Sequence, residues 1–213
     1  MKVRIVGSGS VAQDLGRGFV KRGDEVKLGS RSPENLADWV EAVGDCASAG
    51  TMEEAAAHGE LLVIAVKGTE TDSAIEEAGK DNFAGKVLVD PTNPIVFDEG
   101  SRPDHLAYGP TDSGGERLQH ALPDAKVVKS FGIVNSGQMV DPEVKGGPAT
   151  MFVAGNDDAA KDTVTRILGD FGWEDVADLG GIEASRELES LCMLWCRYAL
   201  PNQAWHTAFK LLR

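Results

Sequence analysis

The sequence predicts an α/β protein built on a Rossmann-like, doubly wound, mainly parallel sheet with a small C-terminal α/β extension. Apolar, β-branched runs alternate with helical stretches along most of the 213 residues, which is typical of a parallel sheet covered by helices. The run Leu61–Val66 is apolar throughout, as expected of a central strand buried on both faces. A glycine-rich turn joins the first strand to the first helix.

Helix-end signals divide the first third of the chain into elements. Gly23 suits the end of a helix that begins at Ser10. Ser32 and Pro33 are typical of the N-cap and the first position of a second helix. The expected order is strand 3–6, helix 10–22, strand 25–28, helix 33–43, strand 46–49, helix 52–57 and strand 61–66.

The alternation continues on both sides of a long loop at 91–112, which contains four prolines. A loop of that length over a compact domain is either functional or mobile. The remaining expected elements are helix 70–78, strand 87–89, helix 115–121, strand 126–131, strand 149–154, helix 157–171, strand 173–179 and a helical region from 184. We therefore expect a Rossmann domain over 1–148. The extension 149–213 is expected to pack on the same sheet and to form part of a substrate pocket or a dimer contact.

Composition excludes several classes of function. The 21 Lys and Arg against 34 Asp and Glu leave a net charge of −13, which argues against binding of nucleic acid or of an anionic membrane. Three Cys and four His are scattered without disulfide or zinc spacing, so we expect no metal. No secretory leader or membrane-length apolar run is recognisable, and we expect a soluble, cytoplasmic protein.

The segment Gly7-Ser8-Gly9-Ser10-Val11-Ala12 is a G-x-G-x-x-A motif in a strand–turn–helix context. The first glycine permits the tight turn, the second lets the backbone approach a pyrophosphate, and alanine permits close helix–strand packing. The helix N-terminus supplies free N–H groups to the phosphates. We expect dinucleotide binding here, through Gly7, Ser8, Gly9, Ser10 and Val11; the alternative is a glycine turn that binds nothing.

The end of the second strand distinguishes the two nicotinamide dinucleotides. NAD enzymes place an acidic residue there, whereas this chain has Leu28-Gly29-Ser30-Arg31-Ser32. Arg31 can pair with a 2′-phosphate while Ser30 and Ser32 donate hydrogen bonds. The sequence therefore predicts NADP(H); the alternative is a solvated arginine beside a serine helix cap.

Three further strand ends lie at the same expected edge of the sheet. Val66 and Lys67 follow one strand; Lys67 is either near the cofactor or a solvated charge on the rim, which we favour. Asn93-Pro94 follows another, and Asn93 either hydrogen-bonds the nicotinamide ribose or carboxamide or forms an Asx-type turn. Asn135 and Ser136 are expected to line the substrate pocket.

The rest of the sequence offers no catalytic side chain. Cys192 and Cys196 are predicted to be buried core thiols on one helix face. Arg186, Glu187 and Glu189 on the same helix are interpreted as packing or dimer contacts rather than as catalytic groups.

The chain resembles the coenzyme F420-dependent NADP oxidoreductase family over essentially its full length. The segments that carry the resemblance are the G-x-G-x-x-A turn, Gly29-Ser30-Arg31, Val89-Asp90-Pro91-Thr92-Asn93-Pro94, Val127-Val128-Lys129-Ser130-Phe131, Asp178-Leu179-Gly180-Gly181-Ile182-Glu183 and Arg186-x-x-Glu189. The resemblance implies a homodimer that exchanges hydride between C4 of NADPH and C5 of a stacked deazaflavin, with Ser30 and Arg31 on the 2′-phosphate. Many members have a basic residue four positions after the arginine, whereas this chain has Asn35.

Competing functions remain open at this point. Hydride transfer between two stacked cofactors needs orientation and exclusion of water rather than a protein nucleophile. The alternatives are an NADPH-dependent reductase of a flavin, a ferric chelate or a cyclic imine, and a non-catalytic NADP(H)-binding sensor. An imine reductase would need a proton donor beside the nicotinamide, and none is evident.

Replacing Arg31 by Glu is expected to abolish NADPH binding, because a carboxylate at that position repels the 2′-phosphate. A titration of the variant with NADPH measures the effect. Unchanged affinity would rule out Arg31 as the phosphate contact.

Overall fold

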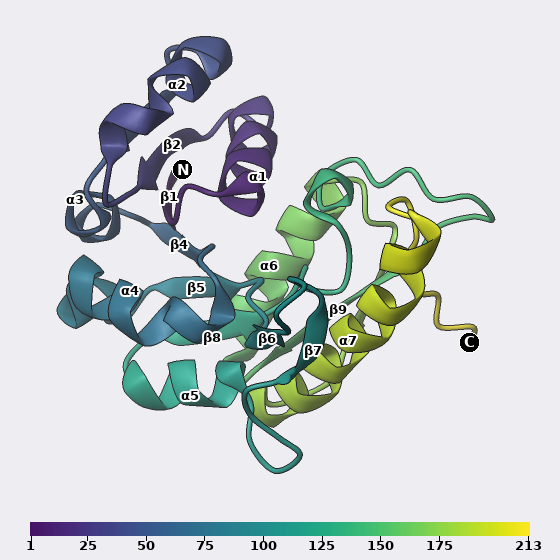
Figure 1. The fold of residues 1–213 in the computed structure, drawn as a ribbon. Coiled ribbons are helices and arrows are strands. Elements are labelled where there is room, and N and C mark those ends of the chain that lie inside the picture. The colour runs from purple at the N-terminus through teal and green to yellow at the C-terminus, as the bar shows by residue number, and fades with distance from the viewer.

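The computed structural model describes residues 1–213 as one eight-stranded sheet with helices on both faces, together with a separate two-stranded hairpin (Figure 1). The strand order in the large sheet is β10-β9-β8-β5-β4-β1-β2-β3. Counted from the edge strand β3, the first six strands have the 3-2-1-4-5-6 order of a Rossmann fold, with β8 in the sixth place. Within this large sheet, only the β8–β9 pairing is antiparallel. The predicted doubly wound, mainly parallel fold is confirmed.

The elements follow the predicted alternation closely. The strands are β1 (Lys2–Val6), β2 (Glu25–Gly29), β3 (Ala47–Gly50), β4 (Leu61–Ile64), β5 (Val87–Asp90), β6 (Ile95–Phe97), β7 (Pro103–Leu106), β8 (Lys126–Lys129), β9 (Thr150–Gly155) and β10 (Asp175–Asp178). The helices are α1 (Ser10–Lys21), α2 (Ala37–Val43), α3 (Met52–Ala57), α4 (Thr71–Ala78), α5 (Gly114–Ala121), α6 (Asp158–Asp170) and α7 (Ser185–Asn202). No helix combines the length and the apolar character that a membrane crossing needs.

Side chains alternate between two buried layers. Val3 and Ile5 of β1 belong to the larger core, with α1, α2 and α6, whereas Val6 faces the smaller core formed with α3, α4 and α5. Both layers are fully buried, which explains why the central strands are apolar at consecutive positions. Helix α7 packs beside the hairpin β6–β7 at one end of the sheet (Figure 1).

The C-terminal strands β9 and β10 extend the same sheet beyond β8. The ring of Phe171, which follows α6, meets the ring of Phe19 in α1 edge to face, with 4.9 Å between the ring centroids. Both rings are about 1% exposed. The N-terminal and C-terminal parts therefore share a core, and a division at residue 148 stays a prediction.

Three local expectations were wrong. The expected loop at 91–112 contains the antiparallel hairpin β6–β7. The second helix starts as a 3-10 turn at Pro33–Leu36, and the Ser32 hydroxyl does not cap it. β8 ends at Lys129 instead of residue 131, because Phe131 adopts a left-handed backbone conformation (φ 64°) that a strand cannot contain.

Phe171→Ala is expected to lower the free energy of unfolding by about 3–5 kcal/mol, because it removes a ring from the shared core. We expect one cooperative thermal transition at a lower temperature, measured by circular dichroism and calorimetry. Phe97→Ala is the control, since this ring is 51% exposed. A variant that melts in two separate transitions would show that residues 149–213 fold as an independent domain.

Candidate functional site

The turn between β1 and α1 is built around Gly7. Its N–H donates to the Gly29 carbonyl at 2.9 Å, and its φ of +135° suits glycine. A Cβ at this position would lie 2.1 Å from the Ala65 carbonyl oxygen, so no other residue fits. The tight turn expected from the sequence therefore requires glycine here, because the backbone of Ala65, just after β4, lies against it.

The N-terminus of α1 is open to a ligand. Gly9 is the N-cap and makes no side-chain cap, and the first turn carries no acidic residue. A Cβ placed on Gly9 would meet nothing within 4 Å, so the space above the turn is free. The first N–H groups of a helix have no intrahelical partner and attract anions. The geometry fits a pyrophosphate in contact with this backbone.

The segment after β2 presents a cation beside that turn. The buried Ser30 hydroxyl donates to the Ser8 hydroxyl at 3.3 Å and accepts the Ser32 N–H at 3.1 Å, which ties the two loops together. Arg31 is exposed and makes no hydrogen bond or ion pair within the chain. Its guanidinium is therefore available to an external anion, while Ser30 has an internal structural role.

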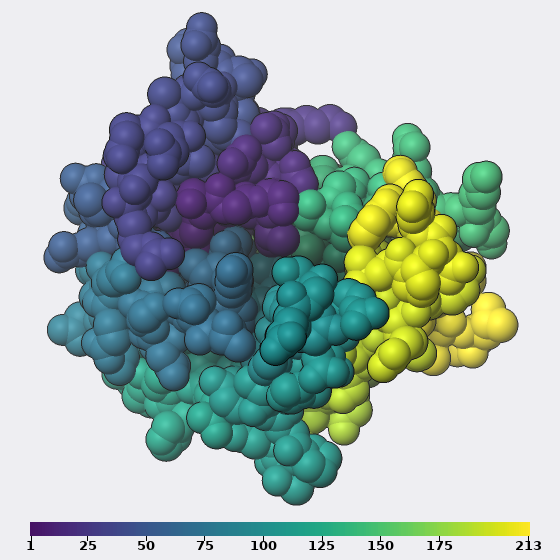
Figure 2. Space-filling view, viewed as in Figure 1, coloured from purple at the N-terminus to yellow at the C-terminus, as the bar shows by residue number.

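These loops line a cleft of about 860 Å³, a size typical of a site for a small molecule or cofactor. Figure 2 shows this face hollowed between the purple N-terminal segment, the blue segment around α4 and the teal segment around β6–β7. Among the candidates from the sequence, the cleft brings together Gly7, Ser8, Gly9, Ser10, Val11, Ser30, Arg31, Ser32, Val66, Lys67 and Asn93. Pro94, Asn135 and Ser136 do not line it.

The cleft also contains residues that the sequence did not single out. Glu70, Ser73 and Glu77 line it from the α4 side, and Ile95 and Phe97 come from β6. The β6 residues were missed because the segment was expected to be an irregular loop. Arg31 and Lys67 are the basic side chains of the lining, and neither forms an ion pair within the chain.

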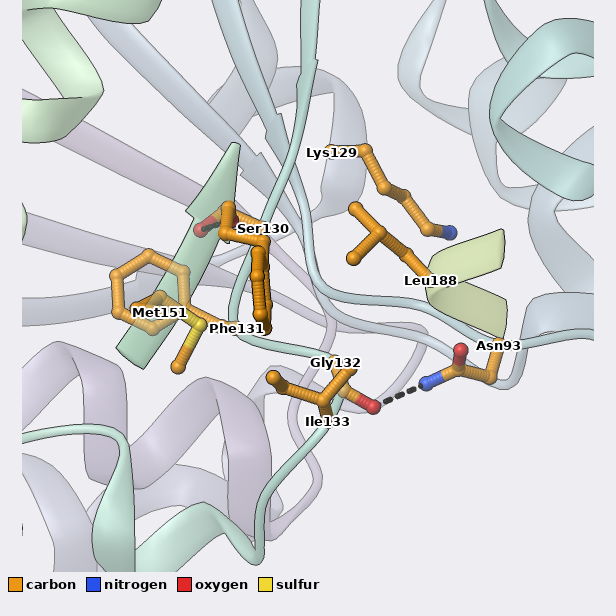
Figure 3. Close-up of a pocket in the computed structure, with 9 residues that line it drawn as sticks. Asn93, Lys129, Ser130, Phe131, Gly132, Ile133, Met151 and Leu188 are labelled. Carbon is orange, nitrogen blue, oxygen red and sulfur yellow. Dashed lines mark hydrogen bonds between the residues drawn. The ribbon is translucent and has the colours of Figure 1, made fainter. Parts of the chain in front are cut away.

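Asn93 lines the cleft and has one polar atom without a partner. Its amide nitrogen donates to the Gly132 carbonyl at 2.8 Å, while its Oδ1 is buried and has no partner (Figure 3). An Asx turn would need that oxygen to accept a backbone N–H, so the structure does not form the Asx turn considered for this residue. A buried acceptor without a partner is uncommon in proteins and suits a ligand that donates a hydrogen bond.

A buried ionic cluster lies directly behind Asn93. The Lys129 ammonium contacts Asp90 at 3.0 Å and Glu189 at 2.9 Å, and all three side chains are no more than 2% exposed. Burial alone would lower the pKa of Lys129, but the carboxylates of Asp90 and Glu189 outweigh it and raise that pKa above its ordinary value. Lys129 therefore stays charged. The sequence signal for this cluster is a lysine inside an apolar strand, a residue that carries the family resemblance but had no predicted role.

The remaining candidates on α7 have structural partners. Arg186 forms a two-point ion pair with Glu116 of α5, and this contact holds the pKa of the Glu116 carboxyl below its usual range. Cys192 and Cys196 are both buried and form no disulfide. The hydrogen bond with Cys196 and burial raise the pKa of the Cys192 thiol, so it stays protonated.

Comparison with known proteins identifies the family. The model of the family described as NADP oxidoreductase, coenzyme F420-dependent, matches residues 2–94. The crystal structure of a candidate F420-dependent NADP reductase from Arthrobacter sp. FB24 superimposes with a TM-score of 0.94 and 37% identity, covering 100% of both chains. The chain belongs to the F420-dependent NADP oxidoreductase family.

Two curated relatives match about nine-tenths of this chain but differ in how much of their own length is matched. The F420-dependent NADP reductase of Methanocaldococcus jannaschii is 25% identical over 91% of this chain and 90% of its own. The metalloreductase STEAP3 of Rattus norvegicus is 30% identical over 89% of this chain, which spans only 36% of that longer protein. As a family member, the chain is an NADP-dependent oxidoreductase.

Two glycine variants distinguish the role of this turn in protein stability from its role in leaving space for a ligand. Gly7→Ala is expected to destabilise the protein, because the added methyl group collides with the Ala65 backbone. Gly9→Ala is expected to keep the melting temperature but to weaken NADPH binding by about tenfold, because the methyl group occupies the space where a pyrophosphate approaches. Thermal melts and NADPH titrations measure both. Full NADPH affinity in Gly9→Ala would contradict a pyrophosphate position above this turn.

Proposed function

We propose that the cleft binds NADP(H) with its pyrophosphate on the N-terminus of α1 and its 2′-phosphate on Arg31. The observation that carries this proposal is an unpaired guanidinium beside a free helix N-terminus, in a chain with a net charge of −13. Two preformed anion-binding groups in an acidic protein indicate a specific anionic ligand. Ser32 and the backbone around Val66 are proposed to line the adenosine half.

The nicotinamide end is proposed to lie at Asn93. Its unpartnered Oδ1 is an acceptor for an amide N–H or a ribose hydroxyl, and its nitrogen is held by Gly132. Ile95 and Phe97 border the same end of the cleft with apolar surface. Such surface favours a flat aromatic acceptor and limits access of water to the reacting atoms. Lys67 is proposed to stay on the rim.

We propose a deazaflavin of the coenzyme F420 type as the hydride acceptor. Bound NADPH supplies a hydride from C4 of the nicotinamide, and C5 of the deazaflavin accepts it. The chain's own contribution is to hold the two rings face to face and dry, and no acid or base is required of it. The support is the match to the family model over residues 2–94 and the similarity to the Arthrobacter structure along the whole chain. A homodimer in the cytoplasm is part of the same proposal.

Reduction of a ferric chelate or a flavin is the second candidate. The observation that favours it is the 30% identity with the metalloreductase STEAP3 across 89% of this chain. The chain spans about a third of that protein.

Anaerobic stopped-flow mixing tests the acceptor. NADPH and the protein are mixed with oxidised F420, FMN, ferric citrate or a cyclic imine in parallel, and NADPH absorbance is followed together with that of each acceptor. We expect turnover with F420 and much slower turnover with the others. NADH in place of NADPH is the control and should react poorly. Turnover of FMN or ferric citrate alone would replace the deazaflavin proposal, and tight NADPH binding without any turnover would support a sensor.

A further inference from the structure

The Lys129 ammonium uses all three of its protons on separate acceptors. They are the Asp90 carboxylate at 3.0 Å, the Glu189 carboxylate at 2.9 Å and the backbone carbonyl of Thr92. An ammonium group has three donors and no acceptor, so its hydrogen-bonding capacity is filled inside the protein. Lys129 therefore has no free proton to offer a substrate, and any role in the reaction is indirect.

Two of these three acceptors lie at the end of β5, in Asp90, and in the turn that follows it, in Thr92. The other oxygen of Asp90 accepts both the N–H and the hydroxyl of Thr92, at 2.8 and 2.7 Å. Lys129 thus contacts the turn at the Asp90 carboxylate and at the Thr92 carbonyl. The next residue in the chain is Asn93, which lines the cleft and whose Oδ1 is buried without a partner. The conformation of the turn that presents Asn93 is fixed from behind by one cation.

The loop after β8 is held against this turn. Asn93 donates to the carbonyl of Gly132, three residues beyond Lys129. Between them, Phe131 has a φ of +64°, and the N–H groups of Gly132 and Ile133 each bond to a carbonyl two residues earlier. A strained backbone of this kind persists only when its surroundings determine it. Figure 3 shows Lys129, Asn93 and Gly132 around one small cavity, of about 10 Å³.

We propose that Lys129 is a positioning residue for the nicotinamide end of NADP(H), acting through Asp90, Thr92 and Asn93. This inference rests on the proposed binding of NADP(H) in the cleft. Lys129 touches neither the cleft nor, by this proposal, the cofactor. Its loss is expected to release the Thr92–Asn93 turn while leaving the phosphate contacts at α1 and Arg31 intact.

The chain contains a matched control for the stabilising role of a buried lysine. Lys161 of α6 is also largely buried and also bridges two carboxylates, Asp158 at 3.2 Å and Asp178 at 2.8 Å. None of these three residues lines the cleft. Lys161→Met therefore removes a similar cation from the fold without touching the turn that carries Asn93.

The experiment compares the affinities for NADPH and for 2′,5′-ADP, which has the adenosine 2′-phosphate but no nicotinamide, in Lys129→Met and Lys161→Met. For Lys129→Met we expect NADPH to bind about tenfold more weakly, with 2′,5′-ADP within about twofold of wild type. We also expect a changed emission maximum of bound NADPH. Lys161→Met should lower the melting temperature and change neither affinity.

The outcomes separate the two proposals. Equal loss of NADPH and 2′,5′-ADP binding in Lys129→Met, or an unchanged NADPH affinity, would overturn the positioning role. A wild-type protein that binds neither ligand would instead overturn the proposed cofactor site. If Lys129→Met does not fold, Glu189→Gln weakens the hold on Lys129 from α7, outside the cleft. It should then shift NADPH affinity alone, and an unshifted affinity would overturn the inference.

Discussion

The ion pairs of Lys129 with Asp90 and Glu189 are the interactions on which the turn that carries Asn93 depends. They join the ends of β5 and β8 to α7, and Glu189 also accepts the N–H groups of Gly114 and Gly115 at the start of α5. Burying charges is unfavourable unless each is paired and hydrogen-bonded, as all three are here. Removing one member of such a cluster destabilises a protein by about 3–5 kcal/mol, because its partners stay buried and charged.

A cluster of this kind is expensive as a source of stability, since well-packed apolar side chains often serve equally well. The advantage of the cluster is that its hydrogen bonds have defined directions. An apolar side chain at 129 could fill the volume, but it could not hold the Thr92 carbonyl and the Asp90 carboxylate at defined distances. The hydrogen bonds therefore specify one conformation for the turn, and Asn93 inherits that conformation at the edge of the cleft.

Local signals predicted much of the fold, whereas distant contacts remained hidden. The turn at Gly7 and the helix from Ser10 are encoded in neighbouring residues. The position of Arg31 directly after β2 is encoded locally in the same way. Asp90 and Lys129 meet across 39 positions of sequence, and their pairing depends on β5 lying beside β8. Without the strand order, a lysine in an apolar strand has no visible partner. The hairpin at 95–106 was missed because β6 is only three residues long and β7 contains Pro103, and both features are typical of a loop.

The acidity of the whole chain and the anion binding proposed for its cleft are compatible because they act at different ranges. Exposed charges farther apart than about 8–10 Å are screened at physiological salt, so most of the net charge of −13 contributes little at Arg31. The N–H groups of α1 and an adjacent guanidinium act at hydrogen-bond distance and are not screened in that way. Specific recognition of NADP(H) then requires only that no carboxylate stand next to the phosphate positions, and the segment Gly29–Ser32 meets that condition. An oxidoreductase whose chemistry is supplied by its bound partners needs few reactive side chains of its own, but it needs accurate distances. On the proposed placement of NADP(H), those distances depend on glycines at the phosphate end and on a buried salt-bridge cluster at the other.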